Sequence, residues 1–224
     1  MLRQMAGARR FNQWMAKTVS PYVHGATIEL GAGIGNLTQL LYPSASYYLA
    51  TDTDTDHLQY LSRVASVETA ICDASLQEDI LPLEGKFNTA VCLNVLEHIP
   101  DDEGTLRNIS RLLKPHGRAI VLVPQGPGAF GSLDRVLEHQ RRYTEEELRR
   151  KLAVAGLLVE KILPFNRITY LGWIVNGRIL RRTTLSQLQL RLLDWFVPIL
   201  QRFDERLPWP STSLIAVARR NTPE

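Results

Sequence analysis

The sequence predicts an open α/β fold built on a largely parallel sheet. Short apolar segments alternate along the chain with segments of helical periodicity, which is the pattern of repeated strand–helix–strand units. A glycine-rich turn at residues 31–36 follows the first apolar segment, and polar side chains follow several of the later ones. Because ligands bind outside the carboxyl ends of the strands in such sheets, these residues are expected along one edge.

The individual elements are placed by their apolar periodicity and by their start and stop residues. Thr144 and Glu147 form a capping box at the start of one helix, and Gly156 ends that helix. Residues 124–143 show no regular period. Strands are expected at 27–30, 47–51, 67–72, 87–93, 118–123, 157–165 and 213–218, and helices at 5–20, 37–42, 54–65, 101–113 and 144–155.

The charge is unevenly distributed over the 224 residues. Residues 1–140 contain 11 Lys and Arg against 15 Asp and Glu, a net charge of −4, whereas residues 141–224 contain 15 against 8, a net charge of +7. The basic C-terminal third fits an anionic partner, such as a membrane surface, a nucleic acid or an acidic substrate. It equally fits a solvated surface rich in arginine.

The cellular location is predicted from the cysteines and from the apolar segments. Cys72 and Cys92 lie in apolar runs, so we expect buried thiols and a reducing, cytoplasmic environment. Residues 1–10 lack the apolar core of a signal peptide. The longest apolar stretch, at 188–200, is interrupted by charged residues and a proline, so no membrane span is expected.

The glycine-rich turn has the pattern Gly-x-Gly-x-Gly at Gly31, Gly33 and Gly35. Without Cβ atoms, its backbone can approach a ligand closely. The dinucleotide-binding fingerprint requires a further glycine where Asn36 stands. Glu29, inside the preceding strand, is unfavourable beside a pyrophosphate but suits a ligand with an ammonium group and a sulfonium. The turn therefore favours a sulfonium cofactor over a dinucleotide, with a plain tight turn as the structural alternative.

Two acidic residues follow the next two expected strands. Asp52 ends the second strand, where a carboxylate can accept two hydrogen bonds from a ribose diol. Asp73 follows the third strand and can accept a hydrogen bond from an adenine amino group, with Ala74 against the ring. The alternative for each is structural: Asp52 as a helix cap, Asp73 as a turn residue.

Together, residues 28–124 resemble the class I S-adenosylmethionine-dependent methyltransferases. The resemblance rests on the residues above and on Asn94-Val95-Leu96-Glu97-His98-Ile99. That segment is similar to the N-V-L-E-H-I signature of the small-molecule branch, such as quinone-biosynthesis methyltransferases. The resemblance implies a Rossmann-like, seven-stranded, mostly parallel sheet with helices on both faces and an antiparallel last strand. It also implies S-adenosyl-L-methionine as the cofactor and S-adenosyl-L-homocysteine as the product.

The resemblance assigns roles in cofactor binding to particular residues. It implies that Gly31, Gly33 and Asn94 face the methionine end, Asp52 the ribose and Asp73 the adenine amino group. The expected cofactor site is completed by Glu29, Ala32, Asn36, Thr53 and Ala74. The implied strand order separates the strands of the two cysteines, so no disulfide is expected.

Three residues are candidate bases for the methyl transfer: His139, His98 and Tyr143. The segment from His139 to Thr144 resembles an H-x-R-R-Y-T segment common in bacterial small-molecule methyltransferases, and an imidazole titrates near neutral pH. The alternative is that both histidines only stabilise their loops. No metal-ligand spacing such as Cys-x-x-Cys occurs, so no metal site is predicted.

Residues 166–210 form an expected helical insertion before the last strand, with an apolar stripe flanked by arginines. The insertion can be a lid over a hydrophobic substrate, a homodimer contact, or a helix on an anionic membrane surface; the structural alternative is an accessory helical subdomain. Residues 1–24 are expected to form an N-terminal helical cap beside it. The whole chain, 1–224, is expected to be a single methyltransferase domain.

The predicted activity is methyl transfer to a hydrophobic or lipid-linked small molecule, at oxygen rather than carbon or nitrogen. RNA or protein methylation is an alternative. No nucleic-acid partner is expected, because neither an Asn-Pro-Pro-Tyr-type tetrapeptide nor an appended nucleic-acid module is found. A non-catalytic cofactor-binding subunit is a further alternative, against which the intact glycine loop argues. Glu29 and Asn36 argue against a nicotinamide oxidoreductase.

Overall fold

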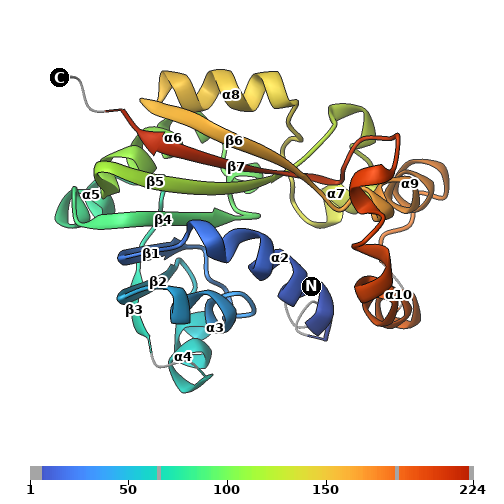
Figure 1. Cartoon of the computed structure of the whole chain (residues 1–224), viewed down its shortest axis with the longest axis horizontal. Helices are drawn as coiled ribbons and strands as arrows, with labels where there is room; N and C mark the ends of the chain where they lie inside the picture. The colour runs from blue at the N-terminus through green and yellow to red at the C-terminus, as the bar shows by residue number, and fades with distance from the viewer. Residues whose placement is uncertain (1–6, 65–66, 185–186, 222–224) are drawn as a thin grey trace.

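The computed structural model describes residues 7–64, 67–184 and 187–221. Its strands are β1 Ala26–Leu30, β2 Tyr47–Asp52, β3 Glu68–Ile71, β4 Phe87–Leu93, β5 Leu113–Pro124, β6 Leu157–Phe165 and β7 Ser213–Arg220. Its α-helices are α2 Arg9–Val19, α3 Thr38–Leu41, α4 Thr55–Val64, α5 Gln77–Ile80, α6 Asp102–Leu112, α7 Ser132–Val136, α8 Glu145–Val154, α9 Ile168–Ile174 and α10 Gln187–Leu200. Figure 1 shows their arrangement.

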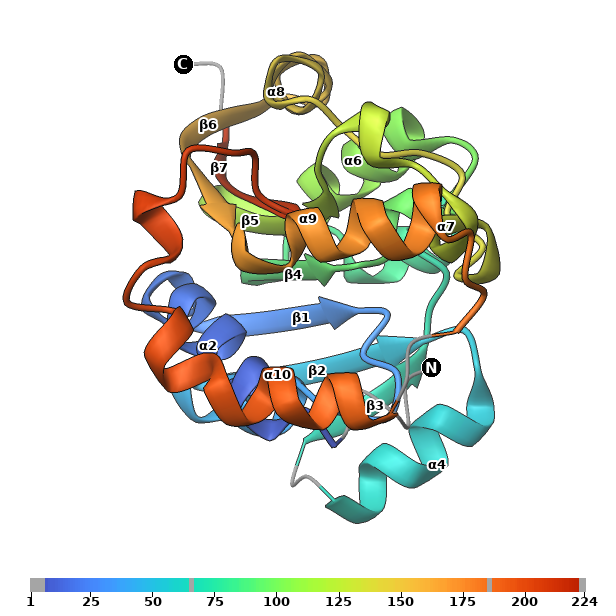
Figure 2. The ribbon, with the colours of Figure 1, turned by 90° about the vertical axis from the view of Figure 1, so that its right-hand side faces the viewer.

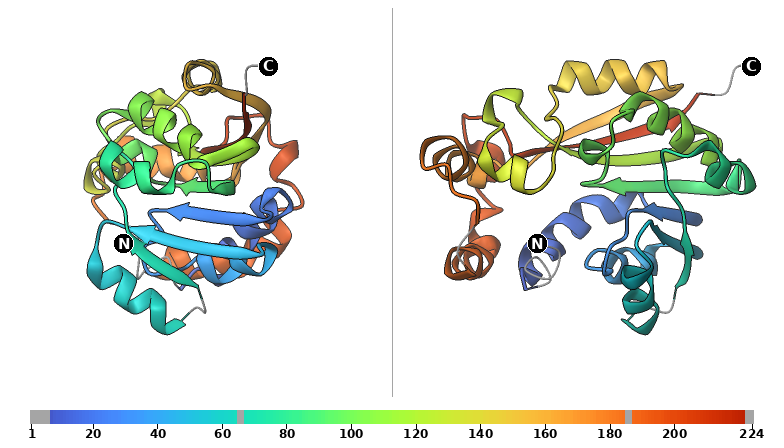
Figure 3. Two further views of the ribbon diagram at one scale, coloured as in Figure 1. Left: turned by 90° about the vertical axis from the view of Figure 1, so that its left-hand side faces the viewer. Right: turned by 180° about the vertical axis from the view of Figure 1, so that it is seen from behind.

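The strands form one seven-stranded sheet in the order β3-β2-β1-β4-β5-β7-β6. The pairs from β3 to β5 are parallel, whereas β7 runs antiparallel to both β5 and β6. Helices flank the twisted sheet on both faces (Figures 1 and 3). The expected Rossmann-like sheet with an antiparallel last strand is therefore confirmed.

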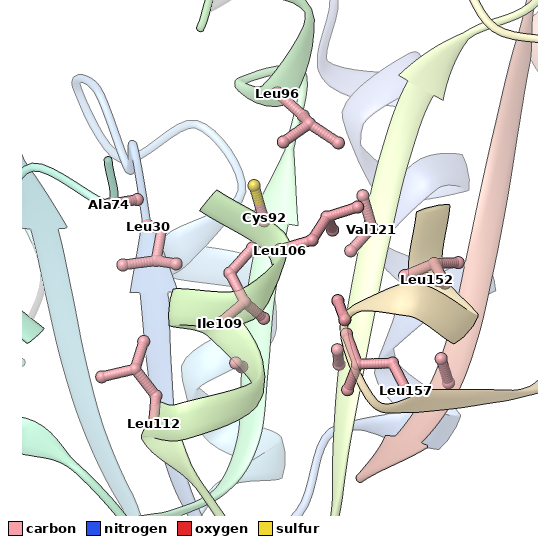
Figure 4. Packing of buried hydrophobic residues seen from close by; sticks show 14 of the residues in the cluster. Leu30, Ala74, Cys92, Leu96, Leu106, Ile109, Leu112, Val121, Leu152 and Leu157 are labelled. Carbon is pink, nitrogen blue, oxygen red and sulfur yellow. The ribbon is translucent and has the colours of Figure 1, made fainter. Parts of the chain in front are cut away.

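Each face of the sheet packs against its own hydrophobic core, because successive side chains of a buried strand point to opposite faces. On one face, Leu106, Ile109 and Leu112 of α6 pack with Leu30 and Cys92 of the strands (Figure 4). The opposite core joins buried side chains of α2, α3 and α4 to the other sides of β2, β4, β5 and β7. This two-sided burial is why the central strands read as continuous apolar runs.

The predicted strand bounds agree closely with those of the structure. They differ where contacts between distant segments determine the secondary structure. β4 and β6 have the expected bounds, but β5 starts at Leu113 rather than at residue 118, because its first residue pairs with Phe87 across an irregular register. Residues 124–143, which show no regular period in the sequence, contain α7, and α5 follows β3, where the sequence predicts no helix. The first helix begins at Arg9, and residues 1–6 of the expected cap lie outside the described residues.

Residues 166–210 enter the fold between β6 and β7. They contain α9, a π-helical turn at Val175–Ile179, α10 and a short 3₁₀ turn at Asp204–Arg206. These elements lie beyond the end of the sheet to which the arrow of β4 points (Figure 1), and α9 and α10 cross in front of the strands when that end faces the viewer (Figure 2). Within the described residues, no helix has the length and apolar character needed to cross a bilayer.

Truncating a buried side chain in the core on the α6 face is expected to lower the free energy of unfolding substantially. Leu106 is completely buried. Leu106→Ala is therefore expected to lower the free energy of unfolding by about 2–5 kcal/mol, through lost transfer energy and a residual cavity.

Leu81 provides the control for this prediction, because it is 51% exposed. Leu81→Ala is expected to change the free energy of unfolding by about 0.5 kcal/mol or less. Urea unfolding of both variants measures the difference, and equal losses would contradict the assigned packing.

Candidate functional site

The site is built where β1 and β4 lie side by side in parallel. Leu30 pairs with Cys92 at the ends of the two strands, so the segments that follow them leave the sheet at the same edge. From this point the strand order runs outward in both directions, through β2 on one side and β5 on the other. Such a switch in strand order is where open α/β sheets bind ligands.

Gly31 lies at the closest approach of these two segments. Its φ is +68°, in the left-handed region that favours glycine. An added Cβ would lie 2.4 Å from Cγ2 of Val95, which belongs to the segment that follows β4. The backbone after β1 therefore packs tightly against that segment, and only glycine fits at this position.

Asp52 braces the glycine-rich turn from the end of β2. Its Oδ2 accepts a hydrogen bond of 2.7 Å from the backbone N–H of Gly33, and its Oδ1 accepts one of 3.0 Å from the N–H of Asp54. Nδ1 of His57 lies 3.3 Å from the same Oδ1. A carboxylate offers about four acceptor positions, so Asp52 retains capacity for a ligand hydroxyl beside the turn.

Glu29 is buried inside β1 and has polar partners on neighbouring elements. Its Oε2 accepts hydrogen bonds from the hydroxyl of Thr38 at 2.6 Å and from that of Tyr48 at 3.0 Å. Burial raises the pKa of Glu29, although these two hydrogen bonds oppose the shift. The carboxyl group is thus held in a fixed orientation just before the glycine-rich turn.

The remaining predicted cofactor residues lie along the same edge. Ala32 is buried in the turn and Asn36 is half-buried at its end, whereas Thr53 is exposed after β2. Oδ1 of Asp73 accepts hydrogen bonds from both the backbone N–H and the hydroxyl of Ser75, and the carbonyl of the buried Ala74 accepts one from Asn108 of α6.

Asn94 stands at the first position after β4. Its side chain is exposed, and its φ of +57° turns the chain sharply away from the sheet. Its N–H donates to the carbonyl of Leu122 in β5, which fixes the turn to the neighbouring strand. Asn94 therefore faces the same edge as Gly31, across the β1–β4 boundary.

Two of the predicted bases, His98 and His139, lie together beyond Asn94. Their rings meet edge to face with centroids 4.9 Å apart, and Nε2 of His139 lies 3.9 Å from Oε1 of Glu97. The backbone N–H and the side chain of Gln140 donate to the carbonyls of Glu97 and His98, both at 2.8 Å. These bonds hold the segment of His139 against the segment after β4.

The environments of these three side chains differ. Glu97 is completely buried, and burial raises its pKa to about 8. His98 is exposed at the surface of the group, and partial burial together with the neighbouring His139 lowers its pKa. Within the described residues, Glu97, His98 and His139 form a group whose potential metal-ligand atoms all lie within 4.8 Å of one another. The sequence predicts no metal site, because it contains no recognisable metal-ligand spacing.

Asp134 of α7 links this group to the insertion. Its Oδ1 accepts from Nε of Arg142 at 2.7 Å and lies 3.0 Å from Nδ1 of His139, and its Oδ2 accepts from Nε1 of Trp173 at 3.1 Å. Burial opposes its ionisation, but the bond from His139 and the charge of Arg142 hold the pKa of Asp134 below its usual value. Arg142 in turn lies over the Trp173 ring.

Tyr143, the third predicted base, is completely buried, and its hydroxyl donates to Oδ2 of Asp102 at 2.9 Å. Burial and the charge of Asp102 raise the pKa of Tyr143 far above its usual value. Lys151 and Arg141 also bind Asp102, at 2.5 and 3.0 Å. Because its side chain contacts no solvent and is held by Asp102, we leave Tyr143 out of the proposed catalytic group.

A family model described as "Methyltransferase domain" matches residues 8–162 of this chain, which include the glycine-rich turn, Asp52, Asp73 and the segment after β4. The chain belongs to this methyltransferase family. It is a class I S-adenosylmethionine-dependent methyltransferase, as the sequence indicated. S-adenosylmethionine is its cofactor.

Curated relatives of the methyltransferase include a ubiquinone biosynthesis O-methyltransferase from Xanthomonas euvesicatoria pv. vesicatoria. It is 26% identical over 178 residues, which cover 72% of this chain and 73% of the relative.

Solved structures share the fold at lower identity. An S-adenosylmethionine-dependent methyltransferase from Archaeoglobus fulgidus aligns with a TM-score of 0.65 and 15% identity, covering 95% of this chain and 94% of that one. One from Mesorhizobium loti aligns with a TM-score of 0.64 and 15% identity, covering 93% of this chain and 98% of that one.

Two residues of the candidate site of this methyltransferase were not predicted from the sequence as site residues. Glu97 enters the sequence prediction only as part of the segment after β4, and Asp134 does not enter it. A carboxylate one position before a candidate base is a usable signal for Glu97. No sequence signal identifies Asp134, because its three side-chain partners come from two different segments that meet only in the folded chain.

The close packing at Gly31 predicts a specific loss of cofactor binding. Gly31→Ala places a Cβ against Val95 in a left-handed backbone conformation. Such strain costs about 1–3 kcal/mol, so the affinity for S-adenosylhomocysteine should fall about tenfold or more. Gly128→Ala is the control, since an added Cβ meets nothing within 4 Å there. Isothermal titration calorimetry measures both, and unchanged affinity in Gly31→Ala would remove this turn from the binding site.

Proposed function

We propose that this methyltransferase transfers a methyl group to an oxygen atom of a hydrophobic or lipid-linked small molecule. The observation that carries the proposal is the apolar, arginine-flanked insertion of α9 and α10 placed beyond the cofactor edge of the sheet. The O-methyltransferase name of the Xanthomonas relative supports oxygen as the acceptor atom.

We propose that the cofactor lies across the ends of β1, β2 and β4. Gly31 and Asn94 lie beside the methionine end, with Glu29 oriented towards the amino group, and Asp52 receives the ribose hydroxyls. Asp73 and Ala74 receive the adenine. The site is completed by Ala32, Gly33, Asn36 and Thr53. S-adenosylmethionine supplies an electrophilic methyl group on its sulfonium sulfur, so the protein's task is to align an acceptor oxygen and exclude water.

We propose His139 and His98 as the groups that handle the proton of the acceptor. His139 has the better-defined orientation, because its Nδ1 faces Asp134 and its Nε2 is left towards the interior of the group. His98 is the more exposed of the two. A phenol or enol acceptor suits such weak bases at neutral pH.

The insertion supplies a surface for a hydrophobic partner. One face of α10 carries large apolar side chains at helical spacing. Of these, Leu192, Trp195 and Ile199 are 49%, 62% and 54% exposed. The opposite side is attached to α2, where Asp194 accepts from the N–H of Phe11 and Arg10 donates to the carbonyl of Trp195. We propose peripheral contact of this face with an anionic membrane, from which a lipid-linked acceptor enters; a homodimer contact is the competing use.

The role of Asp52 predicts the effect of its removal on cofactor binding. Asp52→Ala removes the bond to Gly33 and the proposed bonds to the ribose, which as charged hydrogen bonds contribute about 1.5–3 kcal/mol each. The affinity for S-adenosylhomocysteine should therefore fall about 10- to 100-fold or more by calorimetry. Asp56→Ala removes an exposed acid in the next helix and is the control. Equal affinity in both variants would remove Asp52 from the site.

The membrane proposal predicts a change in liposome binding. The double variant Leu192→Asp/Trp195→Asp should lose most of its flotation with vesicles containing anionic phosphatidylglycerol, because it replaces exposed apolar area with negative charge. Tyr60→Asp/Leu81→Asp adds the same charge at two other exposed apolar positions and should float like the original chain. Equal flotation of both variants contradicts the proposal, as does conversion of a dimer to a monomer by the first variant alone.

The acceptor class is tested with labelled S-adenosylmethionine and extracted cell-envelope lipids and quinone precursors. The proposal predicts base-stable label in an organic-soluble product at a phenolic or enolic oxygen. Label recovered only in RNA or protein would contradict it.

A further inference from the structure

Glu97 is a buried carboxylate without a hydrogen-bond partner among the described residues. Its side chain is completely buried, and neither carboxylate oxygen accepts a hydrogen bond from any other described residue. Placing a carboxyl group in a protein interior without a partner carries a large desolvation cost. Glu97 lies in the 3₁₀ turn Leu96–His98 after β4, at the edge of the sheet where we propose that the cofactor binds.

The charge of Arg142 acts on Glu97, but Arg142 is not its ion-pair partner. Arg142 is bound to Asp134 at 2.7 Å and to the carbonyl of Gln125 at 2.9 Å, and its guanidinium lies over the ring of Trp173. Among the described residues, the ion-pair partner of Arg142 is Asp134 and not Glu97. Arg142 therefore serves Asp134, and the Glu97 carboxylate faces the two histidines instead.

His139 is oriented as metal-binding histidines are. Its Nδ1 lies 3.0 Å from Oδ1 of Asp134, so donation of the Nδ1 proton leaves the lone pair of Nε2 directed towards Glu97. The 3.9 Å between Nε2 and Oε1 of Glu97 is too long for a hydrogen bond. A carboxylate behind the far nitrogen is the usual outer support of a metal-ligating imidazole.

His98 supplies the third potential ligand atom and the route to solvent. All three ligand atoms lie within 4.8 Å of one another. They can share an ion at about 2.0–2.2 Å once the side chains move closer together. Because His98 is exposed whereas Glu97 is buried, an ion can enter from the solvent side and reach the buried carboxylate.

We propose that Glu97, His98 and His139 bind a divalent transition-metal ion, with Asp134 orienting His139. Two imidazole nitrogens and one carboxylate oxygen favour Zn²⁺, Fe²⁺ or Ni²⁺ over Mg²⁺ and Ca²⁺, which prefer all-oxygen sites. Three protein ligands leave at least one coordination position open. This proposal replaces the sequence-based prediction of no metal.

The role of the ion rests on the proposed O-methylation, whereas its binding does not. With the ion bound, His98 and His139 act on the acceptor proton as ligands of the ion and not as bases. The open position holds the acceptor hydroxyl and lowers its pKa, which a weak base alone does poorly for an alcohol. The hydroxyl proton passes to water, the oxygen forms its bond to the methyl carbon, and the carbon–sulfur bond breaks with both electrons remaining on sulfur. The products are the methyl ether and S-adenosylhomocysteine.

Metal binding is tested directly on the full chain after chelator treatment and dialysis. Titration with ZnCl₂ should give one site per chain, and Glu97→Gln should weaken it more than about 100-fold, since loss of an outer partner alone costs about 10- to 100-fold. Gln keeps the shape of the side chain without its charge, so the variant should remain folded by circular dichroism. His139→Gln should weaken binding similarly.

The matched control is His116→Gln, which removes an exposed histidine near the start of β5, away from the site. It should bind Zn²⁺ like the original chain. No saturable binding by the original chain, or equal affinity in Glu97→Gln and the original chain, overturns the proposed site, as does binding of MgCl₂ in preference to ZnCl₂.

The catalytic role is tested separately. With an identified acceptor, chelation and Glu97→Gln should each abolish transfer while S-adenosylhomocysteine affinity stays unchanged, and added Zn²⁺ should restore activity to the chelated original chain only. Full activity in chelator overturns the role but leaves the site standing. Failure to find any methylated oxygen overturns the proposed function, and the titration then still decides the site.

Discussion

The parallel pairing of β1 with β4 determines where every residue of the site can lie. It brings the backbone after Leu30 and the backbone after Leu93 to one edge, so close that a glycine is required at position 31. Asp52, one strand away, then reaches the N–H of Gly33 and stabilises the turn. This strand order therefore brings the proposed cofactor residues to the same edge as Glu97 and His98.

Most of this edge could be predicted from the sequence, because it is encoded locally. The apolar runs of β4 and β6 have the expected bounds, and the Gly-x-Gly-x-Gly pattern, Glu29 and Asp52 each carry a chemical requirement that short-range reasoning can recognise. Parallel strands then force residues that follow successive strands to one edge. Local signals and topology favoured a sulfonium cofactor, and the resemblance to class I methyltransferases implied S-adenosylmethionine.

The acceptor side could not be predicted in the same way, because it is assembled from distant segments. Asp134 can be assigned to the site only from its contacts with His139, Arg142 and Trp173. Trp173 belongs to the insertion. Tyr143 was expected in the site on its motif alone, yet its ring turns into the core to meet Asp102. The direction of a side chain in an irregular loop depends on contacts with distant segments. It therefore cannot be predicted from the spacing of residues in the sequence.

The placement of the cofactor at the carboxyl ends of β1, β2 and β4 can be checked by a crystal structure of the chain with S-adenosylhomocysteine. We expect density for the homocysteine end beside Gly31 and Asn94 and for the ribose at Asp52. Density for the nucleoside at another edge of the sheet, or no bound nucleoside at saturating concentration, would contradict this placement.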